Sequence, residues 1–235
     1  MTTFALVHGG WHGAWCWERL APLLQRAGHA VATMDLPCDD GTASFDTYAD
    51  VVCAALEGYG DDVVLVGHSL GGHTIPLVAW RRPVRHLVYL CAVVPDIGRS
   101  LFDQLQDASP PMNPDCRKGL ERDGQKRRIW VDLSVARDLL YADCDEQTVE
   151  AALKRLRPQA DHPQKYPLSL SEFPSVPCSY VVCTEDRMIL PEWSKRVARD
   201  RIGADLIELP GSHSPMLSRP SVLADALLGV ADATS

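Results

Sequence analysis

The feature that most constrains the fold is an apolar stretch that runs directly into a glycine-flanked serine. Residues Val63–Leu70 read VVLVGHSL, and two further glycines follow. The apolar part predicts a buried strand, and the letters GHSLG match the G-x-S-x-G pattern of a sharp strand-to-helix turn. Such a turn raises a serine hydroxyl above the end of a sheet. The next backbone N–H, on Leu70, then points toward a developing oxyanion. The pattern therefore predicts Ser69 as a nucleophile.

Apolar runs alternate with helix-like segments on both sides of a polar middle region. Before that region we expect strands over Phe4–Val7, Ala30–Asp35, Val63–Val66 and Val84–Val93, and helices over Trp15–Arg26, Phe45–Leu56 and Leu70–Trp80. After it we expect strands over Cys178–Cys183 and Asp205–Leu209, and helices over Pro191–Arg201 and Ser221–Ala231. Continuous apolar strands alternating with helices predict an α/β fold with a mostly parallel sheet of about six strands, covered by helices on both faces. Such sheets bind ligands at the carboxyl ends of their strands.

The middle region, residues 95–177, interrupts this alternation. Its composition is polar, and it holds a charged run, Arg117–Arg128, which we interpret as a solvated surface. Two segments have helical spacing, Val135–Tyr141 and Asp145–Leu156. We therefore expect a helical cap inserted into one core domain, which comprises residues 1–94 and 178–235.

A serine nucleophile needs a base and an acid that orients the base. In strand-to-helix turns of this kind they follow the serine in the order acid, then histidine. Asp186 follows the strand Cys178–Cys183, and His213 follows the next strand, so both belong to the edge that holds Ser69. His213 would accept the proton of the serine hydroxyl and return it later, while Asp186 would hold the imidazole of His213 in the correct tautomer. Glu185 stays open as an alternative acid, and Asp35 is a weaker one.

A glycine-rich segment follows the first strand, where a second oxyanion-binding loop belongs. Residues 8–15 read HGGWHGAW. Glycines let the backbone approach a substrate carbonyl, and we expect the N–H of Gly10 to complement that of Leu70. His8, His12, His68 and His73 match no zinc spacing, so no metal is expected.

Composition excludes several partners. The 235-residue chain has a net charge of −8, which argues against binding to nucleic acid or an anionic membrane. Its first residues have no signal-peptide pattern and no apolar run reaches the length of a membrane span, so a cytoplasmic location is expected. The eight cysteines include no C-x-x-C pair and read as reduced, mostly buried thiols. The oligomeric state stays open, a homodimer being one alternative.

The motifs together resemble the α/β-hydrolase fold. The opening FALVHGGWHGAWCWERLAPLLQRAGHAVATMDLP, the acid loop TEDRMILPEW and the terminal loop GSHSPMLSRP are similar to the branch of plant methyl esterases, hydroxynitrile lyases and small bacterial esterases. The stretch ARDLLYADCDEQTVEAALKRLRP is similar to the cap of that branch. The resemblance implies cofactor-independent ester hydrolysis through an acyl-enzyme on Ser69. Lyases of this branch carry a lysine after the histidine and a threonine in the oxyanion loop, where this chain has Ser214 and Gly9. Lyase activity is therefore not expected.

The expected substrate is a small to medium apolar ester, and its pocket is the least defined part of the site. Our candidate substrate-binding residues are Trp11, His12, His68, Trp130 and Met216. We expect the two histidines to bond backbone around the site as well. Two other functions stay open: a lactonase, cyclase or C–C bond hydrolase with the same three residues, and a ligand receptor that retains the fold but turns over slowly.

Overall fold

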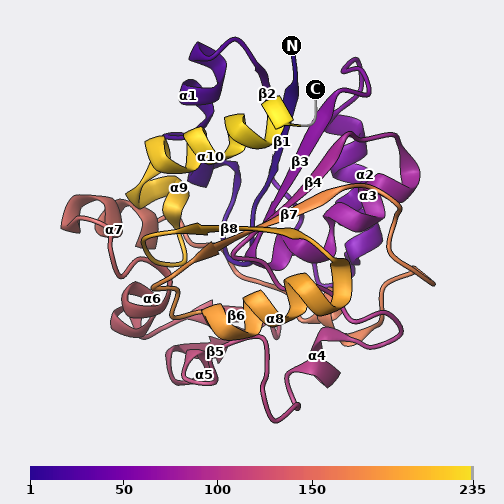
Figure 1. The fold of residues 1–235 in the computed structure, drawn as a ribbon. Helices are drawn as coiled ribbons and strands as arrows, with labels where there is room; N and C mark the ends of the chain where they lie inside the picture. Colours follow the sequence, from indigo (N-terminus) through magenta and orange to yellow (C-terminus); the bar gives the residue numbers. More distant parts are fainter. Residues whose placement is uncertain (234–235) are drawn as a thin grey trace.

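The centre of the molecule is a six-stranded parallel sheet. A computed structural model describes residues 1–233. The strand order is β2-β1-β3-β4-β7-β8, and every neighbouring pair is parallel (Figure 1). The strands are β1 (Thr3–Val7), β2 (Ala30–Thr33), β3 (Val63–His68), β4 (His86–Leu90), β7 (Cys178–Cys183) and β8 (Asp205–Leu209). The predicted α/β fold with about six strands is confirmed, and β7 and β8 have the predicted bounds.

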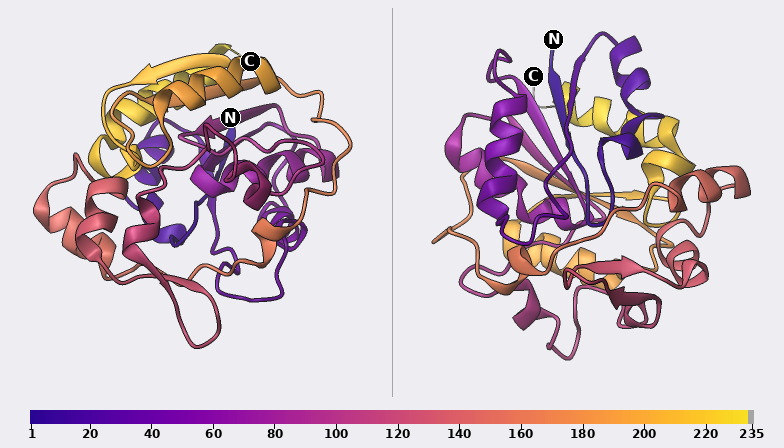
Figure 2. Two further views of the ribbon diagram at one scale, coloured as in Figure 1. Left: turned by 90° about the horizontal axis from the view of Figure 1, so that it is seen from below. Right: turned by 180° about the vertical axis from the view of Figure 1, so that it is seen from behind.

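Helices cover both faces of this sheet. Helix α1 (Ala21–Arg26) packs with α10 (Pro220–Ala233) on one face, and α2 (Phe45–Ala55) packs with α3 (Ile75–Arg81) on the other (Figures 1 and 2). Helix α8 (Pro191–Ile202) packs against the last two strands. β1, β3 and β4 are buried throughout, as expected for strands covered on both faces.

Two predicted helices are each divided into two shorter ones. The segment predicted over Trp15–Arg26 forms a 3-10 helix η1 (Ala14–Trp17) and then α1, whose first turn contains a proline. The segment predicted over Leu70–Trp80 forms η2 (Ser69–His73) and then α3, again with a proline in the first turn. Proline has no N–H to donate to the preceding turn, so it favours the start of a helix over its interior.

The insertion between β4 and β7 contains more than helices. Its elements are α4 (Leu101–Gln104), α5 (Cys116–Gly119), β5 (Leu120–Arg122), β6 (Arg128–Trp130), α6 (Leu133–Leu140), α7 (Glu146–Leu153) and η3 (His162–Lys165). In Figure 1 these elements lie beyond the carboxyl ends of the sheet strands. The antiparallel hairpin of β5 and β6 was not predicted, because three-residue strands show too little alternation to be recognised. A short helix of the core, α9 (Pro215–Ser218), follows β8.

The charged run in the insertion is only partly a solvated surface, which corrects the sequence interpretation. Arg122 and Arg128 both pair with Asp161, at 2.5 and 2.6 Å, and the Asp161 side chain is only 5% exposed. Burial alone would raise the pKa of this carboxyl, but the hydrogen bonds from the two guanidinium groups outweigh it and lower the pKa. The hairpin is therefore joined to the rest of the insertion by two ion pairs that share one buried carboxylate.

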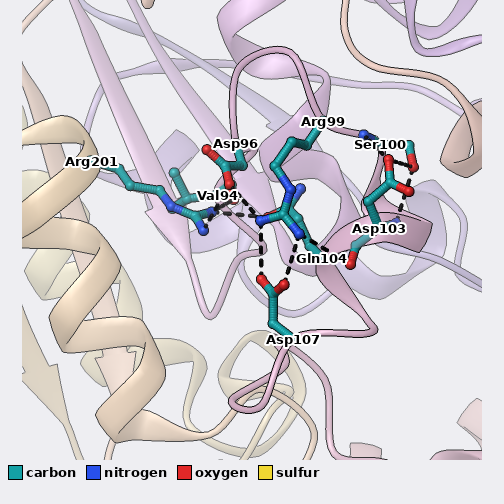
Figure 3. A network of polar contacts seen from close by, with 8 residues as sticks. All are labelled: Val94, Asp96, Arg99, Ser100, Asp103, Gln104, Asp107 and Arg201. Atoms are coloured by element: carbon teal, nitrogen blue, oxygen red, sulfur yellow. Dashed lines mark hydrogen bonds and ion pairs between the residues drawn. The ribbon is translucent and has the colours of Figure 1, made fainter.

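An arginine-centred network joins the start of the insertion to the core (Figure 3). Arg201 of α8 donates hydrogen bonds to the Val94 carbonyl and to Gln104 Oε1, both at 2.9 Å. Arg99 pairs with Asp107 at 2.7 Å and with Asp96 at 2.9 Å, and Asp96 also lies 3.5 Å from Arg201. Helix α4 is thereby tied to α8.

Three of the eight cysteines are half-buried and the other five are buried, and all eight are free. Burial raises the pKa of several thiols, including that of Cys38 to about 11. Within residues 1–233 there is no helix both long and apolar enough to span a bilayer.

Candidate active site

Ser69 occupies the sharp turn between β3 and η2. Its φ is +51°, in the left-handed region that few side-chain-bearing residues adopt. The turn is possible because the flanking glycines lie against backbone: a Cβ on Gly67 would lie 2.8 Å from the Gly71 carbonyl oxygen, and one on Gly71 would lie 2.8 Å from that of Val7. The tight turn predicted from the G-x-S-x-G pattern is therefore present, and it leaves Ser69 8% exposed.

Asp186 and His213 form a buried pair at the carboxyl ends of β7 and β8. His213 Nδ1 lies 2.9 Å from Asp186 Oδ2, and the two side chains are 1% and 2% exposed. The other carboxylate oxygen accepts hydrogen bonds from the N–H groups of Met188 and Ile189, at 2.8 and 3.0 Å. Glu185 is exposed, and it is Asp186 that contacts the imidazole. Asp35, the weaker alternative, instead accepts a hydrogen bond from the N–H of Ala14.

His68 connects this pair to the serine. Its Nε2 donates a hydrogen bond to the carbonyl oxygen of His213 at 2.9 Å, and the two imidazole rings lie 4.7 Å apart. Burial lowers the pKa of His68 well below its usual value, so the ring is neutral. Because Ser69 is the next residue, His68 holds the His213 loop against the turn that carries the serine.

The glycine-rich loop after β1 lies directly against Ser69. A Cβ on Gly9 would lie 2.7 Å from Ser69 Cβ, so only glycine permits this approach. His8 Nδ1 donates a hydrogen bond to the Gly9 carbonyl at 2.8 Å, and its Nε2 accepts one from the Leu36 N–H at 2.9 Å. In a trans peptide the carbonyl of Gly9 and the N–H of Gly10 point in opposite directions. His8 therefore fixes the direction of the Gly10 N–H.

His12 secures the second peptide of the loop. Its Nδ1 donates to the Gly10 carbonyl at 2.7 Å, and its Nε2 accepts from the Tyr141 hydroxyl at 2.8 Å. Burial lowers the pKa of His12 to about 3 and that of His8 to about 4, so both rings are neutral near pH 7. With both nitrogens occupied, His12 positions the loop and has no polar atom free for substrate, contrary to its predicted binding role.

Only part of the predicted substrate-binding set faces a cleft. Trp11, at φ +61°, lines a cleft of about 300 Å³ with Phe102, Leu105, Met112, Leu120 and Arg128. Trp130 packs edge-on against Trp11 with ring centroids 5.3 Å apart. Met216 is fully buried in α9 and does not line this cleft. His68 is likewise fully buried and engaged with the His213 loop, so we assign it a positioning role.

The insertion also supports the histidine loop. Asp143, between α6 and α7, accepts hydrogen bonds from the Ser212 hydroxyl and from Arg219 Nε, the latter at 3.1 Å. Ser212 directly precedes His213. At Gly211 the backbone has φ +117°, and a Cβ there would lie 2.6 Å from Asp143 Oδ2. The loop therefore depends on a side chain from the insertion.

Sequence reasoning missed three polar residues of the insertion that contact the site region: Tyr141, Asp143 and Gln159. Gln159 is 1% exposed, and its Oε1 faces Gly10, where an added Cβ would lie 3.4 Å away. Tyr141 and Asp143 lie in the stretch that resembles the cap of the related branch, but nothing in that stretch marks them as contacts of the site, and Gln159 lies outside it. Each reaches the site through a contact with a residue more than sixty positions away, which a local pattern does not show. In residues 1–233 no group of three or more His, Cys, Asp or Glu side chains is arranged to hold a metal ion.

The comparison with known proteins agrees with this geometry. The model of the alpha/beta hydrolase family matches residues 4–226. Salicylic acid-binding protein 2 of Nicotiana tabacum is 32% identical, and the match covers 97% of this chain and 96% of that protein. Methylesterase 2 of Arabidopsis thaliana is 29% identical, with 97% and 95% covered. A pyrethroid hydrolase from Sphingobium faniae has a solved structure that superposes with a TM-score of 0.86, at 25% identity over 99% of this chain and 98% of that one.

The chain therefore belongs to the alpha/beta hydrolase family. Its relatives include methylesterases, as the resemblance in the sequence motifs implied.

Proposed function

We propose that this protein is a carboxylic ester hydrolase in which Ser69 is the nucleophile, His213 the general base and Asp186 the orienting acid. The observation that carries the proposal is the buried hydrogen bond between His213 and Asp186, held beside the strained turn of Ser69. The names of relatives, methylesterase and pyrethroid hydrolase, support the same reaction class.

In this reaction the hydroxyl of Ser69 attacks the ester carbonyl while His213 accepts its proton. The carbonyl oxygen then carries a negative charge, and the N–H groups of Gly10 and Leu70 stabilise this oxyanion. Collapse of the tetrahedral intermediate breaks the bond to the leaving alkoxide, and His213 returns the proton to it. Water then attacks the acyl-enzyme carbonyl while His213 accepts its proton, and collapse of the second intermediate breaks the bond to Ser69, releases the acid and returns the proton to the serine oxygen. Each oxyanion donor contributes about 3 kcal/mol.

Asp186 has two tasks in this scheme. Its Oδ2 accepts the Nδ1–H of His213, which leaves Nε2 as the basic nitrogen, and its negative charge stabilises the imidazolium that forms. Two backbone N–H groups hold its Oδ1, so the carboxylate has a fixed direction. No cofactor has a role in this scheme.

The substrate class we propose is a small to medium apolar ester. The cleft beside Trp11 is lined mainly by apolar side chains, with Arg128 at one side stacked over Phe102 at 5.3 Å. A location in the cytoplasm also stays a proposal.

The test is hydrolysis of a panel of p-nitrophenyl esters by the wild type and by Ser69→Ala. Ser194→Ala is a matched control, because Ser194 is a buried serine in α8 that is hydrogen-bonded to the Tyr180 hydroxyl and contacts none of the three proposed catalytic residues through its hydroxyl. We expect Ser69→Ala to lose at least about 1,000-fold in kcat with its fold intact, while Ser194→Ala stays active. Unchanged turnover in Ser69→Ala would exclude the proposal.

A further inference from the structure

The cleft beside Trp11 is positively charged in a protein whose net charge is −8. Two of its lining residues are cationic, Arg117 of α5 and Arg128 of β6, and within residues 1–233 no aspartate or glutamate belongs to its lining. The cleft has a volume of about 300 Å³. A cavity of about half that volume can bind benzene, so the cleft has room for a small organic molecule.

Arg128 uses only part of its guanidinium group in contacts with the protein. Its Nε donates to Asp161 Oδ1 at 2.6 Å, and its guanidinium carbon lies 5.3 Å from the centre of the Phe102 ring, which lines the same cleft. Its two Nη groups contact no acceptor in the part of the chain that the structure describes. Because Asp161 is not among the lining residues, the Nη edge is the part of Arg128 that is left to face the cleft.

The carboxylate that pairs with Arg128 does not neutralise the charge around it. Asp161 also pairs with Arg122 at 2.5 Å, so two guanidinium groups share one negative charge. Glu121, next to Arg122 in the hairpin, is exposed and does not line the cleft. One positive charge therefore remains beside Asp161 without a partner.

Arg117 adds a second positive charge to the cleft. The nearby Asp115 pairs with Lys118 at 2.9 Å, and among the described residues the Arg117 side chain has no ion-pair partner. Arg117 is exposed, so its guanidinium is also open to solvent. The cleft thus offers two cationic groups to an anion that enters it.

The walls of the cleft are attached to the candidate active site. Trp11 directly follows Gly10 of the proposed oxyanion hole. On another wall, the Asn113 N–H donates to the carbonyl oxygen of Met188 at 2.9 Å, and the N–H of Met188 in turn holds the carboxylate of Asp186. A molecule in the cleft therefore lies between segments that support the oxyanion loop and the acid loop.

We propose that the Trp11 cleft is a binding site for an organic anion, a molecule with a small apolar body and one carboxylate. The two carboxylate oxygens accept parallel hydrogen bonds from the Nη groups of Arg128, a geometry in which the two planar groups match. Arg117 supplies further positive charge, and the apolar body lies against Trp11 and Leu105. A neutral amide of the same shape fits less well, because its NH2 group would face an Nη donor.

The same chemistry can come from two sources, a free carboxylic acid or an ester substrate that carries a second, ionised carboxyl group. The inference goes beyond the proposed esterase function, because binding of a carboxylate requires no catalysis.

Isothermal titration calorimetry of the wild type with 3-phenylpropanoate and with 3-phenylpropanamide tests the site. The two compounds have nearly the same size and differ in charge. We expect the Kd of the carboxylate to be at least about tenfold lower than that of the amide. This preference should decrease as NaCl is added, because salt screens the attraction to the two arginines.

Three arginine variants locate the binding. Arg128→Met should bind the carboxylate and the amide about equally. Arg127→Met is the matched control: it removes the same charge from the adjacent position, where Arg127 pairs with Asp123 outside the cleft lining, and it should keep the wild-type preference. Arg117→Met breaks no ion pair, so we expect it to fold normally and to raise the Kd of the carboxylate about threefold. It keeps the test valid if loss of the Asp161 contact prevents Arg128→Met from folding.

Turnover separates the two sources. Monomethyl adipate and methyl hexanoate differ only in a terminal carboxylate in place of a methyl group. A higher kcat/KM for monomethyl adipate that is lost in Arg128→Met would assign the carboxylate to the substrate. Equal values, with 3-phenylpropanoate still bound, would assign the site to a free acid.

Equal Kd values for the carboxylate and the amide in the wild type would overturn the inference. A preference of wild-type size in both Arg117→Met and Arg128→Met would overturn it as well. Both results come from calorimetry and need no ester hydrolysis. Failure of the proposed esterase function, seen as no turnover of any ester, is therefore distinguishable from failure of this binding site.

Discussion

His8 donates a hydrogen bond from Nδ1 to the carbonyl oxygen of Gly9 at 2.8 Å, and this contact directs the N–H of the following residue. The same imidazole accepts a hydrogen bond from the Leu36 N–H, so its tautomer is fixed. A buried, neutral histidine thus sets the peptide that we propose as half of the oxyanion hole. The hydrogen bond from His8 thus fixes the orientation of the backbone in the glycine-rich loop.

Replacing His8 should impair catalysis more than binding. In His8→Asn the donor no longer holds the Gly9–Gly10 peptide in place, so we expect kcat to fall by about 100-fold with little change in KM. His73→Asn is the control, because His73 is equally buried and donates to a backbone carbonyl, that of Val93, outside the loop. Steady-state kinetics on p-nitrophenyl acetate measure both. A similar loss of kcat in the two variants would show that general loss of packing is responsible.

The two loop glycines should differ in their tolerance of a methyl group. Gly9→Ala places a Cβ 2.7 Å from Ser69 Cβ, so the serine or the loop must move. Gly10→Ala places one 3.4 Å from Gln159 Oε1, a contact that a small movement of the side chain relieves. We expect Gly9→Ala to be inactive and destabilised by about 1–3 kcal/mol, and Gly10→Ala to fold with a Tm near that of the wild type. Urea unfolding and ester turnover report both effects, and equal behaviour of the two variants would contradict this packing.

Stability should decrease as the pH falls from 6.5 toward 4. Burial lowers the pKa of His8 to about 4 and those of His12 and His73 to about 3, whereas in the unfolded chain all three titrate near 6.5. Below pH 6.5 the unfolded state therefore binds more protons than the folded state, and the free energy of unfolding falls with pH. For His8 alone the loss amounts to about 3 kcal/mol by pH 4.

Urea titrations at pH 7, 6 and 5 measure this slope. His73→Phe removes one of the three histidines that take up a proton on unfolding. The pH dependence of the free energy of unfolding between pH 6 and 5 should therefore become shallower, by about 1.4 kcal/mol per pH unit at most. A free energy of unfolding that stays constant from pH 7 to 5 would mean that these histidines are not buried in the folded protein.

Loss of the Asp143 carboxylate should loosen the histidine loop. Asp143→Ala removes the acceptor of Ser212 and Arg219, and His213 then loses the support of its preceding residue. We expect about a tenfold decrease in kcat, because a small displacement of a catalytic group is costly. Asp138→Ala, at an exposed position of α6, should keep full activity. Unchanged kinetics in Asp143→Ala would show that the loop holds its position without the insertion.

Sequence patterns predicted most of what lies along single strands and their ends. Cys178–Cys183 and Asp205–Leu209 were predicted with their observed bounds, because each is a short strand closed by a loop rich in polar residues. Because Ser69, Asp186 and His213 each follow the end of a predicted strand, the sequence also placed them at one edge of the sheet. The choice of Asp186 over Glu185 needed coordinates, since neighbouring loop residues differ only in where their side chains point.

The parts that sequence did not predict depend on contacts between distant segments. Gln159, Asp143 and Tyr141 act through partners in the core, and no local spacing marks them. The opposite error occurred at Met216, which follows the histidine motif closely but is buried in α9. Proximity in sequence to a motif indicates a neighbourhood and does not say which side chain faces the substrate.

The central claim, that Ser69 is the nucleophile, is tested most directly by covalent labelling. The protein is treated with one equivalent of an alkyl fluorophosphonate, and the adduct is located by tandem mass spectrometry while residual ester hydrolysis is followed. We expect a single adduct on Ser69, with activity lost in proportion to labelling and no adduct in Ser69→Ala. Full ester hydrolysis after stoichiometric labelling of Ser69, or inactivation with the adduct on another residue, would contradict the account.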